Sequence, residues 1–267
     1  MMVTASLLIT TYNRPDAIEL CLQSILRQSV LPLEVVVCDD GSTGETKELI
    51  EEYQKKFTVP LIHVWQPDEG FKLAQIRNKG IAKARGNYII QADGDLILHR
   101  HFIKDHLAIA ADGFFTTGSR VLLSPQSTEI LLKNNSIDVK KYSKNGTNFF
   151  NGLRIPLLRN ALTTKYKNKG RYLYYIKGCN MAFWKADLVK INGYNEEING
   201  WGKEDTELCI RLINAGVKKQ FLKFAGITYH LYHPEASKEM LQRNIEMMQE
   251  TIERKRYWTD KGLNQYL

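Results

Sequence analysis

The chain has 267 residues, of which 43% are hydrophobic and 25% charged, and this composition is typical of a globular protein rather than a disordered or fibrous one. Its four cysteines form no CxxC pair and are too few for a disulfide scaffold, which favours a reduced chain in the cytoplasm. The longest apolar runs are strand-sized, far below the roughly 20 residues of a membrane span. The N-terminus has no basic region ahead of an apolar one, so we expect no signal peptide.

The positive charge is concentrated in one segment. The formal net charge is +8, but residues 133–177 hold eleven Lys and Arg against Asp138 alone, a net +10 that leaves −2 for the remainder. One interpretation is a solvated loop. Another is a patch that meets an anionic membrane surface, because six apolar residues lie among the cations: Phe149, Phe150, Leu153, Ile155, Leu157 and Leu158. No nucleic-acid-binding module is recognisable, so nucleic acid is not an expected partner.

The first hundred residues alternate between strand and helix patterns. Strands are expected at residues 3–10, 34–38, 61–65 and 87–92, with helices starting near Pro15, near Ser42 or Thr43 as caps, and over 73–85. This alternation with short connections predicts a doubly wound, parallel α/β sheet that binds ligands at the carboxyl ends of its strands. Asp39, Asp40, Asp93 and Asp95 all follow such ends.

The second half is less regular. Strands are expected at residues 114–123, 172–183, 220–224 and 227–230, and helices at 185–191, 204–215 and 236–258. No internal repeat is present, so one domain with a variable second half is the preferred organisation.

Asp93-Gly94-Asp95 directly follows the fourth expected strand. Gly94 permits a turn that lets both carboxylates point to the same side. Such a pair suits a hard cation, Mg²⁺ or Mn²⁺, that keeps sites open for phosphate oxygens. A polar turn without any ligand is the alternative, but the place of the motif after a buried strand favours a metal.

Asp39-Asp40-Gly41-Ser42 follows the second strand. A carboxylate there can accept from a nucleobase imide or a ribose hydroxyl. The tetrapeptide alone favours helix capping by Asp40 or Ser42, with Gly41 turning the chain.

Gly200-Trp201-Gly202-Lys203-Glu204-Asp205 opens an expected helix. The helix dipole should favour the ionised forms of both acids, and an ionised carboxylate there can take a proton from a sugar hydroxyl. Trp201 offers a flat surface for a sugar ring, with one face left open by its flanking glycines. Acids in a first helical turn are also common for stability alone.

Two histidines, His230 and His233, follow the last expected strand. An imidazole can bind a metal, although a lone histidine more often has a structural role. They become candidate ligands only because Asp95 already suggests a metal.

Together these pieces resemble the family 2 inverting glycosyltransferases of the GT-A fold. The resemblance lies in five stretches in the family's order: SLLITTYNRP at 6–15, CDDGS at 38–42, GFKLAQIRNKGIAKARGNYIIQADGD at 70–95, GWGKEDTELCIRL at 200–212 and YHLYHP at 229–234. The C-terminal stretches are similar to the galactosyl- and N-acetylgalactosaminyl-transferring branch, including bacterial chondroitin-polymerase domains. The fold implied is a Rossmann-like, mixed and mainly parallel sheet with helices on both faces.

The resemblance implies a domain at residues 1–235, with a nucleotide-binding half at 1–98, an acceptor half at 99–235 containing the basic insert at about 124–171, and a C-terminal helical extension at 236–267. On the donor side, Asp40 would accept from uracil, Arg77 would approach the diphosphate and Asp93 would contact the ribose. The nucleotide pocket would be lined by Thr10, Tyr12 and Arg14.

Asp95 and His230 would bind the metal, Mn²⁺ or Mg²⁺, with His233 as the alternative ligand. The catalytic residues would be Asp205, as the base, and Glu204 beside it, and the acceptor sugar would be held by Trp201 and Glu204. Lys203 stands where the family often has glycine, a difference that bears on what enters the acceptor site and leaves the acids untouched. Residues 123–170 match no pattern of the family and leave the acceptor undetermined.

The implied reaction moves a sugar of the Gal, GalNAc, GlcNAc or Glc type from a UDP-sugar to a glycan or lipid-linked oligosaccharide, with inversion to a β-linkage. Assembly of bacterial cell-surface polysaccharide, in the cytoplasm or peripherally on the inner face of the plasma membrane, is the setting that the resemblance implies. A sugar nucleotidyltransferase is one alternative, although TTYNRP lacks the glycine-rich loop expected for a triphosphate. A non-catalytic carbohydrate-binding protein is the other.

Overall fold

Two β-sheets form the centre of the protein, and the structure, a computed structural model, describes residues 2–267. The larger sheet has seven strands in the order β3-β2-β1-β4-β8-β6-β9. The first four are parallel, β8 is antiparallel to both its neighbours, and β9 is parallel to β6. The strands are β1 (Ala5–Thr11), β2 (Glu34–Asp39), β3 (Leu61–Trp65), β4 (Tyr88–Asp93), β6 (Phe114–Thr117), β8 (Asn180–Trp184) and β9 (Lys218–Phe221). The predicted mixed, mainly parallel α/β fold is confirmed.

A second, three-stranded sheet has the order β5-β10-β7. It consists of β5 (Leu96–Leu98), β7 (Val121–Leu122) and β10 (Thr228–His230). The single strand predicted at 114–123 is therefore wrong, because β6 and β7 belong to different sheets. The chain leaves the large sheet at Gly118, where a Cβ atom would lie 2.4 Å from the Asn180 side chain.

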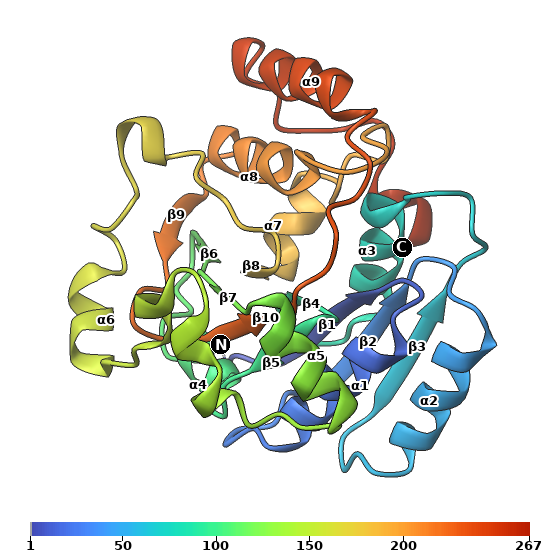
Figure 1. The fold of residues 1–267 in the computed structure, drawn as a ribbon. Helices are drawn as coiled ribbons and strands as arrows, with labels where there is room; N and C mark the ends of the chain where they lie inside the picture. Colours follow the sequence, from blue (N-terminus) through green and yellow to red (C-terminus); the bar gives the residue numbers. More distant parts are fainter. Residues whose placement is uncertain (1) are drawn as a thin grey trace.

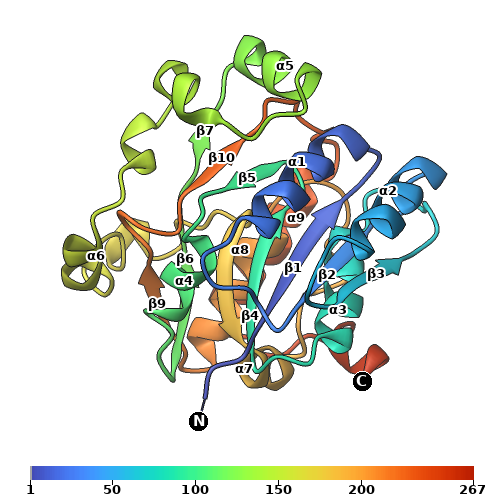
Figure 2. The same ribbon diagram turned by 90° about the horizontal axis from the view of Figure 1, so that it is seen from below.

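Helices cover both faces of the large sheet (Figures 1 and 2). Leu7 and Ile9 of β1 pack in one core with α1 (Pro15–Leu26), α2 (Gly44–Gln54) and α4 (Phe102–Leu107). Leu8 points the other way, into a core with α3 (Leu73–Lys83), α7 (Lys185–Lys190) and α8 (Glu204–Asn214). The side chains of consecutive strand residues point to opposite faces of the sheet. A strand that is covered on both faces is therefore apolar along most of its length.

Several predicted boundaries are corrected. The strand expected at 172–183 is only β8, and the helix expected at 236–258 is the shorter α9 (Leu241–Glu253). Neither Ser42 nor Thr43 caps α2 with its side chain. The Ser42 hydroxyl instead accepts from the backbone N–H of Asn13, 2.8 Å away, and so ties the β2–α2 turn to the β1–α1 turn.

The basic segment is built from short helices. After α5 (Pro125–Lys133) come three 3₁₀ helices, η1 (Val139–Lys141), η2 (Ser143–Asn145) and η3 (Phe149–Gly152), then α6 (Pro156–Leu162) and η4 (Gly170–Tyr172). The start of α5, which was not predicted, does carry a sequence signal: the Ser124 hydroxyl accepts from Ser127 N at 3.2 Å, and Pro125 occupies the first turn. No helix of residues 2–267 is long and apolar enough to cross a bilayer.

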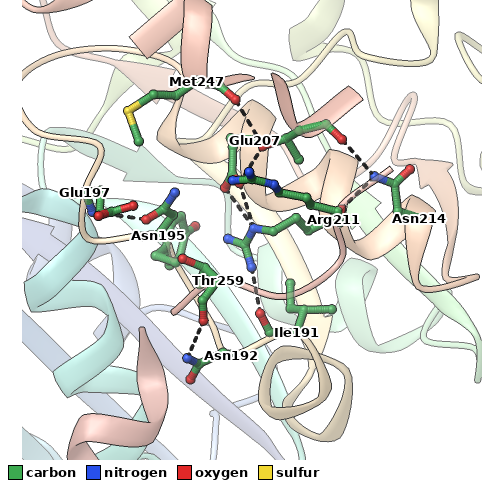
Figure 3. Close-up of polar contacts among 12 residues, drawn as sticks. Ile191, Asn192, Asn195, Glu197, Glu207, Arg211, Asn214, Met247 and Thr259 are labelled. Atoms are coloured by element: carbon green, nitrogen blue, oxygen red, sulfur yellow. Dashed lines mark hydrogen bonds and ion pairs between the residues drawn. The ribbon is translucent and has the colours of Figure 1, made fainter. Parts of the chain in front are cut away.

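The C-terminal extension packs on the domain through α9 and η5 (Leu263–Tyr266), which lie against α8 and α3 (Figure 1). Figure 3 shows its polar anchors on α8. Glu207 pairs with Arg211 at 2.8 Å and also accepts from the Thr251 hydroxyl of α9 at 3.2 Å. Asn214 donates to the carbonyls of Thr251 and Arg256. The extension therefore shares buried polar contacts with the helix that opens at Glu204.

Candidate active site

Asp40 lies in a buried polar pocket after β2. Its carboxylate accepts from Gln66 Nε2 at 2.6 Å and from the backbone N–H of Lys72 at 2.9 Å. Burial raises the pKa of Asp40 to about 6. Gly41 has a φ of +98°, and a Cβ there would lie 2.6 Å from Asp68 Cα, so this turn requires glycine. Gln66 is a site residue that no sequence signal identified.

Thr10 lies near the end of β1 and Tyr12 directly follows the strand, both beside this pocket. The Thr10 hydroxyl donates to Asp93 Oδ1 at 3.0 Å, and the half-exposed Tyr12 donates to Asp68 Oδ2 at 2.8 Å. Arg14 lies in the β1–α1 connection and pairs with Asp16 at 3.1 Å. The structure thus gathers the predicted donor residues at the carboxyl end of the parallel strands, as the sheet topology requires.

Asp93-Gly94-Asp95 forms the turn between β4 and β5. Gly94 N–H donates to the Thr10 carbonyl at 2.7 Å, and a Cβ on Gly94 would lie 2.8 Å from that oxygen. Glycine is therefore needed for close backbone approach. Asp93 is the last residue of β4 in the large sheet, and Asp95 directly precedes β5 in the small sheet.

Asp95, His230 and His233 form a cluster whose ligand atoms all lie within 4.8 Å of one another. Asp95 Oδ2 is 3.5 Å from His230 Nε2 and 3.0 Å from His233 Nε2. β10 pairs antiparallel with β5, which sets His230 opposite Leu96. The small sheet thus brings together residues 135 or more positions apart, and both predicted histidines reach Asp95.

The electrostatics of this cluster suit a cation. Burial works against ionisation of Asp95, but the His233 hydrogen bond and both imidazole charges hold its pKa below the usual value. Asp95 Oδ1 is buried and has no hydrogen-bond partner among the described residues. Buried polar atoms normally have partners, and a divalent ion bound by one carboxylate and imidazole nitrogens would satisfy this one. The donor set therefore fits a divalent metal.

Arg77 of α3 connects this region to the start of α8. It is only 1% exposed, and its Nη2 lies 3.2 Å from Asp93 Oδ1 while its Nη1 lies 3.1 Å from Glu204 Oε1. Its guanidinium carbon is also 5.3 Å from the ring centre of Tyr194. The structure therefore gives Arg77 a bridging position between two carboxylates.

Glu204 and Asp205 open α8, as predicted, where the helix dipole favours ionised carboxylates, but burial outweighs that influence at Glu204. Burial, followed by the charge of Asp205, raises the pKa of Glu204 to about 7 despite the opposing charge of Arg77. Desolvation of a nine-tenths buried carboxyl outweighs the partial charge of a helix end. Glu204 Oε2 has no partner among the described residues.

Asp205 presents one oxygen for chemistry. Its Oδ1 accepts from the Thr206 backbone N–H at 2.6 Å and from the Thr206 hydroxyl at 3.2 Å. Its Oδ2 accepts no hydrogen bond among the described residues and lies against Gly178, where an added Cβ would come within 2.6 Å. Gly178 is thus a second residue that no sequence signal identified, because only the folded chain shows why it must be small.

Trp201 is 37% exposed on the loop before α8. Gly200 and Gly202 both have positive φ angles, +70° and +101°. Lys238 Nζ lies 5.6 Å from the centre of the Trp201 ring, so one part of the expected open surface faces a cation. Asn244 of α9 is fully buried and donates to the carbonyls of Asn199 and Gly202 at 2.9 and 3.0 Å, on either side of Trp201.

The comparisons with known proteins decide the family. The sequence profile described as glycosyl transferase family 2 matches residues 6–177, well over half of the chain. The chain belongs to this family. A second profile, described as N-terminal domain of galactosyltransferase, matches residues 160–234. Membership of glycosyl transferase family 2 confirms the enzyme class and the resemblance that the motifs indicated.

The similar proteins agree with that assignment. Chondroitin synthase of Escherichia coli is 27% identical over 252 residues, which cover 88% of this chain and 35% of that protein; the chain thus spans about a third of this relative. Staphylococcus aureus TarS 1–349 in complex with UDP has a TM-score of 0.65 at 18% identity, over 98% of this chain and 68% of that one. A mannosyltransferase from Pyrobaculum calidifontis in complex with GDP-Man and Mn²⁺ has a TM-score of 0.61 at 18% identity, over 88% and 59%. At these identities the two structures establish the GT-A fold alone.

Proposed function

We propose that this family 2 member transfers a hexosyl group of the Gal, GalNAc, GlcNAc or Glc type from a UDP-sugar to a hydroxyl of a glycan or lipid-linked sugar, with inversion to a β-linkage. The observation that carries the proposal is a carboxylate–imidazole cluster at Asp95 together with a pair of acids at the start of α8, of which Glu204 is joined through Arg77 to Asp93, two residues before Asp95. The first can hold a metal diphosphate, and the second can activate an acceptor. UDP in the complex of TarS favours a uridine donor.

On the donor side, Asp40 is the candidate partner of the base. Its oxygens already accept two hydrogen bonds inside a buried pocket, so its position is fixed before a nucleotide arrives. Thr10 and Arg77 hold Asp93 from two directions, and Asp93 would then meet the ribose. Tyr12 and Arg14 would complete the pocket. Arg77, expected to approach the diphosphate, is buried and paired with two carboxylates, so its role would be to position Asp93.

Asp95, His230 and His233 would hold the metal. Two imidazoles beside one carboxylate favour Mn²⁺ over Mg²⁺, because Mg²⁺ prefers an all-oxygen shell. Such an ion, when bound, neutralises the negative charge of the leaving diphosphate. The mannosyltransferase neighbour contains Mn²⁺.

Asp205 would remove the proton from the acceptor hydroxyl through its free Oδ2. The acceptor oxygen then bonds to the anomeric carbon as the bond from that carbon to the diphosphate breaks, which releases UDP and inverts the centre in one step. General base catalysis of this kind contributes roughly 10²–10⁴-fold. Trp201 and Glu204 would hold the acceptor sugar beside the base, with Glu204 able to donate a hydrogen bond while it is protonated.

The four cysteines are free and buried, which supports a reducing, cytoplasmic setting for the reaction. A sugar nucleotidyltransferase and a non-catalytic carbohydrate-binding protein are less favoured, because family membership and the retained acids both support transfer.

Thermal unfolding with UDP, Mn²⁺, both or neither tests the donor proposal. A ligand at 100 times its Kd stabilises by about 2.7 kcal/mol, so the combination should raise the Tm far more than either component alone. A shift with GDP but not with UDP would overturn the uridine donor. Absence of any nucleotide shift, together with no release of UDP from UDP-sugars, would overturn the transferase proposal for this site.

A further inference from the structure

Exposed apolar side chains are concentrated in residues 149–158. Phe150 is 72% exposed and Leu157 is 87% exposed, the latter more than any other large hydrophobic side chain of residues 2–267. Leu153, Ile155 and Leu158 are exposed too, and neither η3 nor α6 contains a fully buried residue. Folding of the chain alone therefore leaves this apolar surface without a cover, and large exposed apolar patches mark interaction sites.

The cations around this surface are of two kinds. Arg154 and Arg159 point inward and pair with the buried Asp105 at 2.6 and 3.5 Å, which fastens the segment to α4. Six lysines of the basic segment are exposed and form no ion pair with any described residue: Lys133, Lys140, Lys141, Lys144, Lys165 and Lys169. Arg154 and Arg159 thus act as anchors, whereas these six lysines face solvent.

We propose that residues 133–169 form a membrane-contact surface, in which Phe150 and Leu157 enter the interface of an anionic bilayer and the lysines contact its headgroups. Apolar side chains among unpaired cations match a surface that is apolar inside and negatively charged outside. A folded protein partner is less favoured, because six flexible lysines would be costly to order and desolvate in a packed interface, where lysine is depleted. An acidic polymer would use the lysines but not the apolar side chains.

The segment that carries this surface packs beside the small sheet of the candidate metal site. Asn151 of η3 donates to the Arg120 carbonyl at 3.0 Å, and a Cβ on the adjacent Gly152 would lie 3.8 Å from the Tyr229 ring. Tyr229 directly precedes His230 in β10. Figures 1 and 2 show the whole segment from α5 to α6 along one side of the molecule, beside the small sheet that carries the metal cluster.

The consequence rests on the proposed function: the acceptor is the sugar of a membrane-embedded lipid, delivered to Asp205 from the bilayer surface. A lipid-anchored acceptor gains effective concentration when the enzyme occupies the same surface. Membrane contact itself is measured without activity, so its failure is distinguishable from failure of the transferase proposal.

Flotation with vesicles tests the contact. The full chain should float with phosphatidylglycerol-containing vesicles at low salt, and not with pure phosphatidylcholine vesicles. The double variant Phe150→Ser/Leu157→Ser should bind at least about tenfold more weakly, because two large apolar groups lose their burial. The triple variant Lys140→Gln/Lys141→Gln/Lys144→Gln should lose roughly fivefold per lysine, and this loss should vanish at high salt.

Matched controls come from elsewhere on the surface. Leu31→Ser/Leu33→Ser removes two side chains that are 40% and 41% exposed in the α1–β2 connection, and Lys55→Gln/Lys83→Gln/Lys261→Gln removes the same charge. Both controls should float like the wild type, and all variants should keep the wild-type thermal shift with UDP and Mn²⁺. The proposal is overturned if the wild type does not float with anionic vesicles, or if the controls lose as much binding as the test variants. It is also overturned if the protein binds an oligonucleotide as tightly as it binds anionic vesicles and the variant Phe150→Ser/Leu157→Ser weakens neither interaction.

Discussion

Arg77 and Glu204, 127 residues apart in the chain, form a buried ion pair with 3.1 Å between Nη1 and Oε1. The second terminal nitrogen of Arg77 lies 3.2 Å from Asp93. One planar guanidinium therefore joins Asp93, a candidate donor-side carboxylate, to the acid next to the candidate base. Planar, two-pronged geometry is what arginine offers and lysine does not.

Arg77→Lys should therefore impair the enzyme although it preserves the charge. A single ammonium cannot bridge Asp93 and Glu204, which leaves one buried carboxylate unpaired at a cost of about 1–3 kcal/mol in the free energy of unfolding. Urea unfolding measures this loss in the free energy of unfolding. The initial rate of sugar transfer should fall as well.

A double-mutant cycle separates the pair from general damage. Arg77→Met should cost about 3–5 kcal/mol in the wild type but clearly less in a Glu204→Gln background, because only Asp93 is then left as an unpaired carboxylate. Equal costs in both backgrounds would contradict an energetic link between these two residues.

Asp205→Asn should reduce sugar transfer at least about 10²-fold, since the amide cannot accept the acceptor proton. The side chain keeps its size, so its fit against Gly178 is retained and UDP with Mn²⁺ should still raise the Tm as in the wild type. The rate of transfer is measured as the release of UDP. A matched change at the exposed Asp138, Asp138→Asn, should leave the rate unchanged. A fall in UDP affinity on Asp205→Asn would instead place this residue in the donor site.

The two histidines of the metal cluster should both matter. Each of the variants His230→Ala and His233→Ala should need roughly 10-fold more Mn²⁺, or more, to reach the same rise in Tm, because each removes a candidate ligand next to Asp95. The control is His101→Ala, which disrupts another close histidine pair, with ring centres 5.4 Å apart, away from any such cluster. If only one of the two variants responds, the other histidine is not a ligand.

The sequence predicted the first half of the fold well because the physics there is local. Strands such as Glu34–Asp39 have an apolar centre and are buried throughout, and helices such as Pro15–Leu26 place apolar residues at a 3.6-residue period. The basic segment was not predicted, since its short helices bury little and follow no period. The split of 114–123 depends on contact with Asn180, more than sixty residues away, which no local pattern contains.

The candidate site divides in the same way. Asp93, Asp95, Glu204 and Asp205 were found because acids next to strand ends and helix starts are visible in the sequence. Asn244 and Gln66 were missed, because each is an ordinary polar residue whose role arises from tertiary contact. The raised pKa of Glu204 could not be predicted either, because burial by the folded chain is the largest influence on it.

Stability should fall as pH rises through the window set by Glu204. Its pKa is about 7 in the folded protein, against an ordinary value of 4.5 for a glutamate exposed to water. Between these values the folded state holds a proton that the unfolded state has lost, so deprotonation at higher pH favours unfolding, by at most about 1.4 kcal/mol per pH unit. Asp40, with its pKa raised to about 6, contributes in the same direction from about pH 4 upward.

Urea unfolding of the wild type and of Glu204→Gln at several pH values between 5 and 8 measures this effect without metal. The free energy of unfolding of Glu204→Gln, relative to that of the wild type, should increase as pH rises. Glu48→Gln, an exposed change on α2, should follow the wild type throughout. A wild-type-to-variant difference that stays constant with pH would mean that Glu204 remains ionised in the folded protein.

Asn244 should act as a positioning residue for the acceptor. Its side-chain amide holds the carbonyls of Asn199 and Gly202, so Asn244→Ala releases both ends of the Trp201 loop. Loss of two hydrogen bonds worth about 1 kcal/mol each should raise the acceptor KM on the order of tenfold. The KM for the UDP-sugar should change much less, since the Asn244 side chain itself hydrogen-bonds, among the described residues, only to the Asn199 and Gly202 carbonyls.

Asn214→Ala is the matched control for that measurement. Asn214 also donates from one amide to two carbonyls, those of Thr251 and Arg256, and it also joins α8 to the C-terminal extension (Figure 3). It does not touch the Trp201 loop. Its removal should therefore lower the Tm to a similar degree and leave the acceptor KM near the wild-type value. If both variants raise the acceptor KM equally, the extension acts only by general packing, whereas a rise confined to Asn244→Ala establishes that the extension shapes the acceptor site.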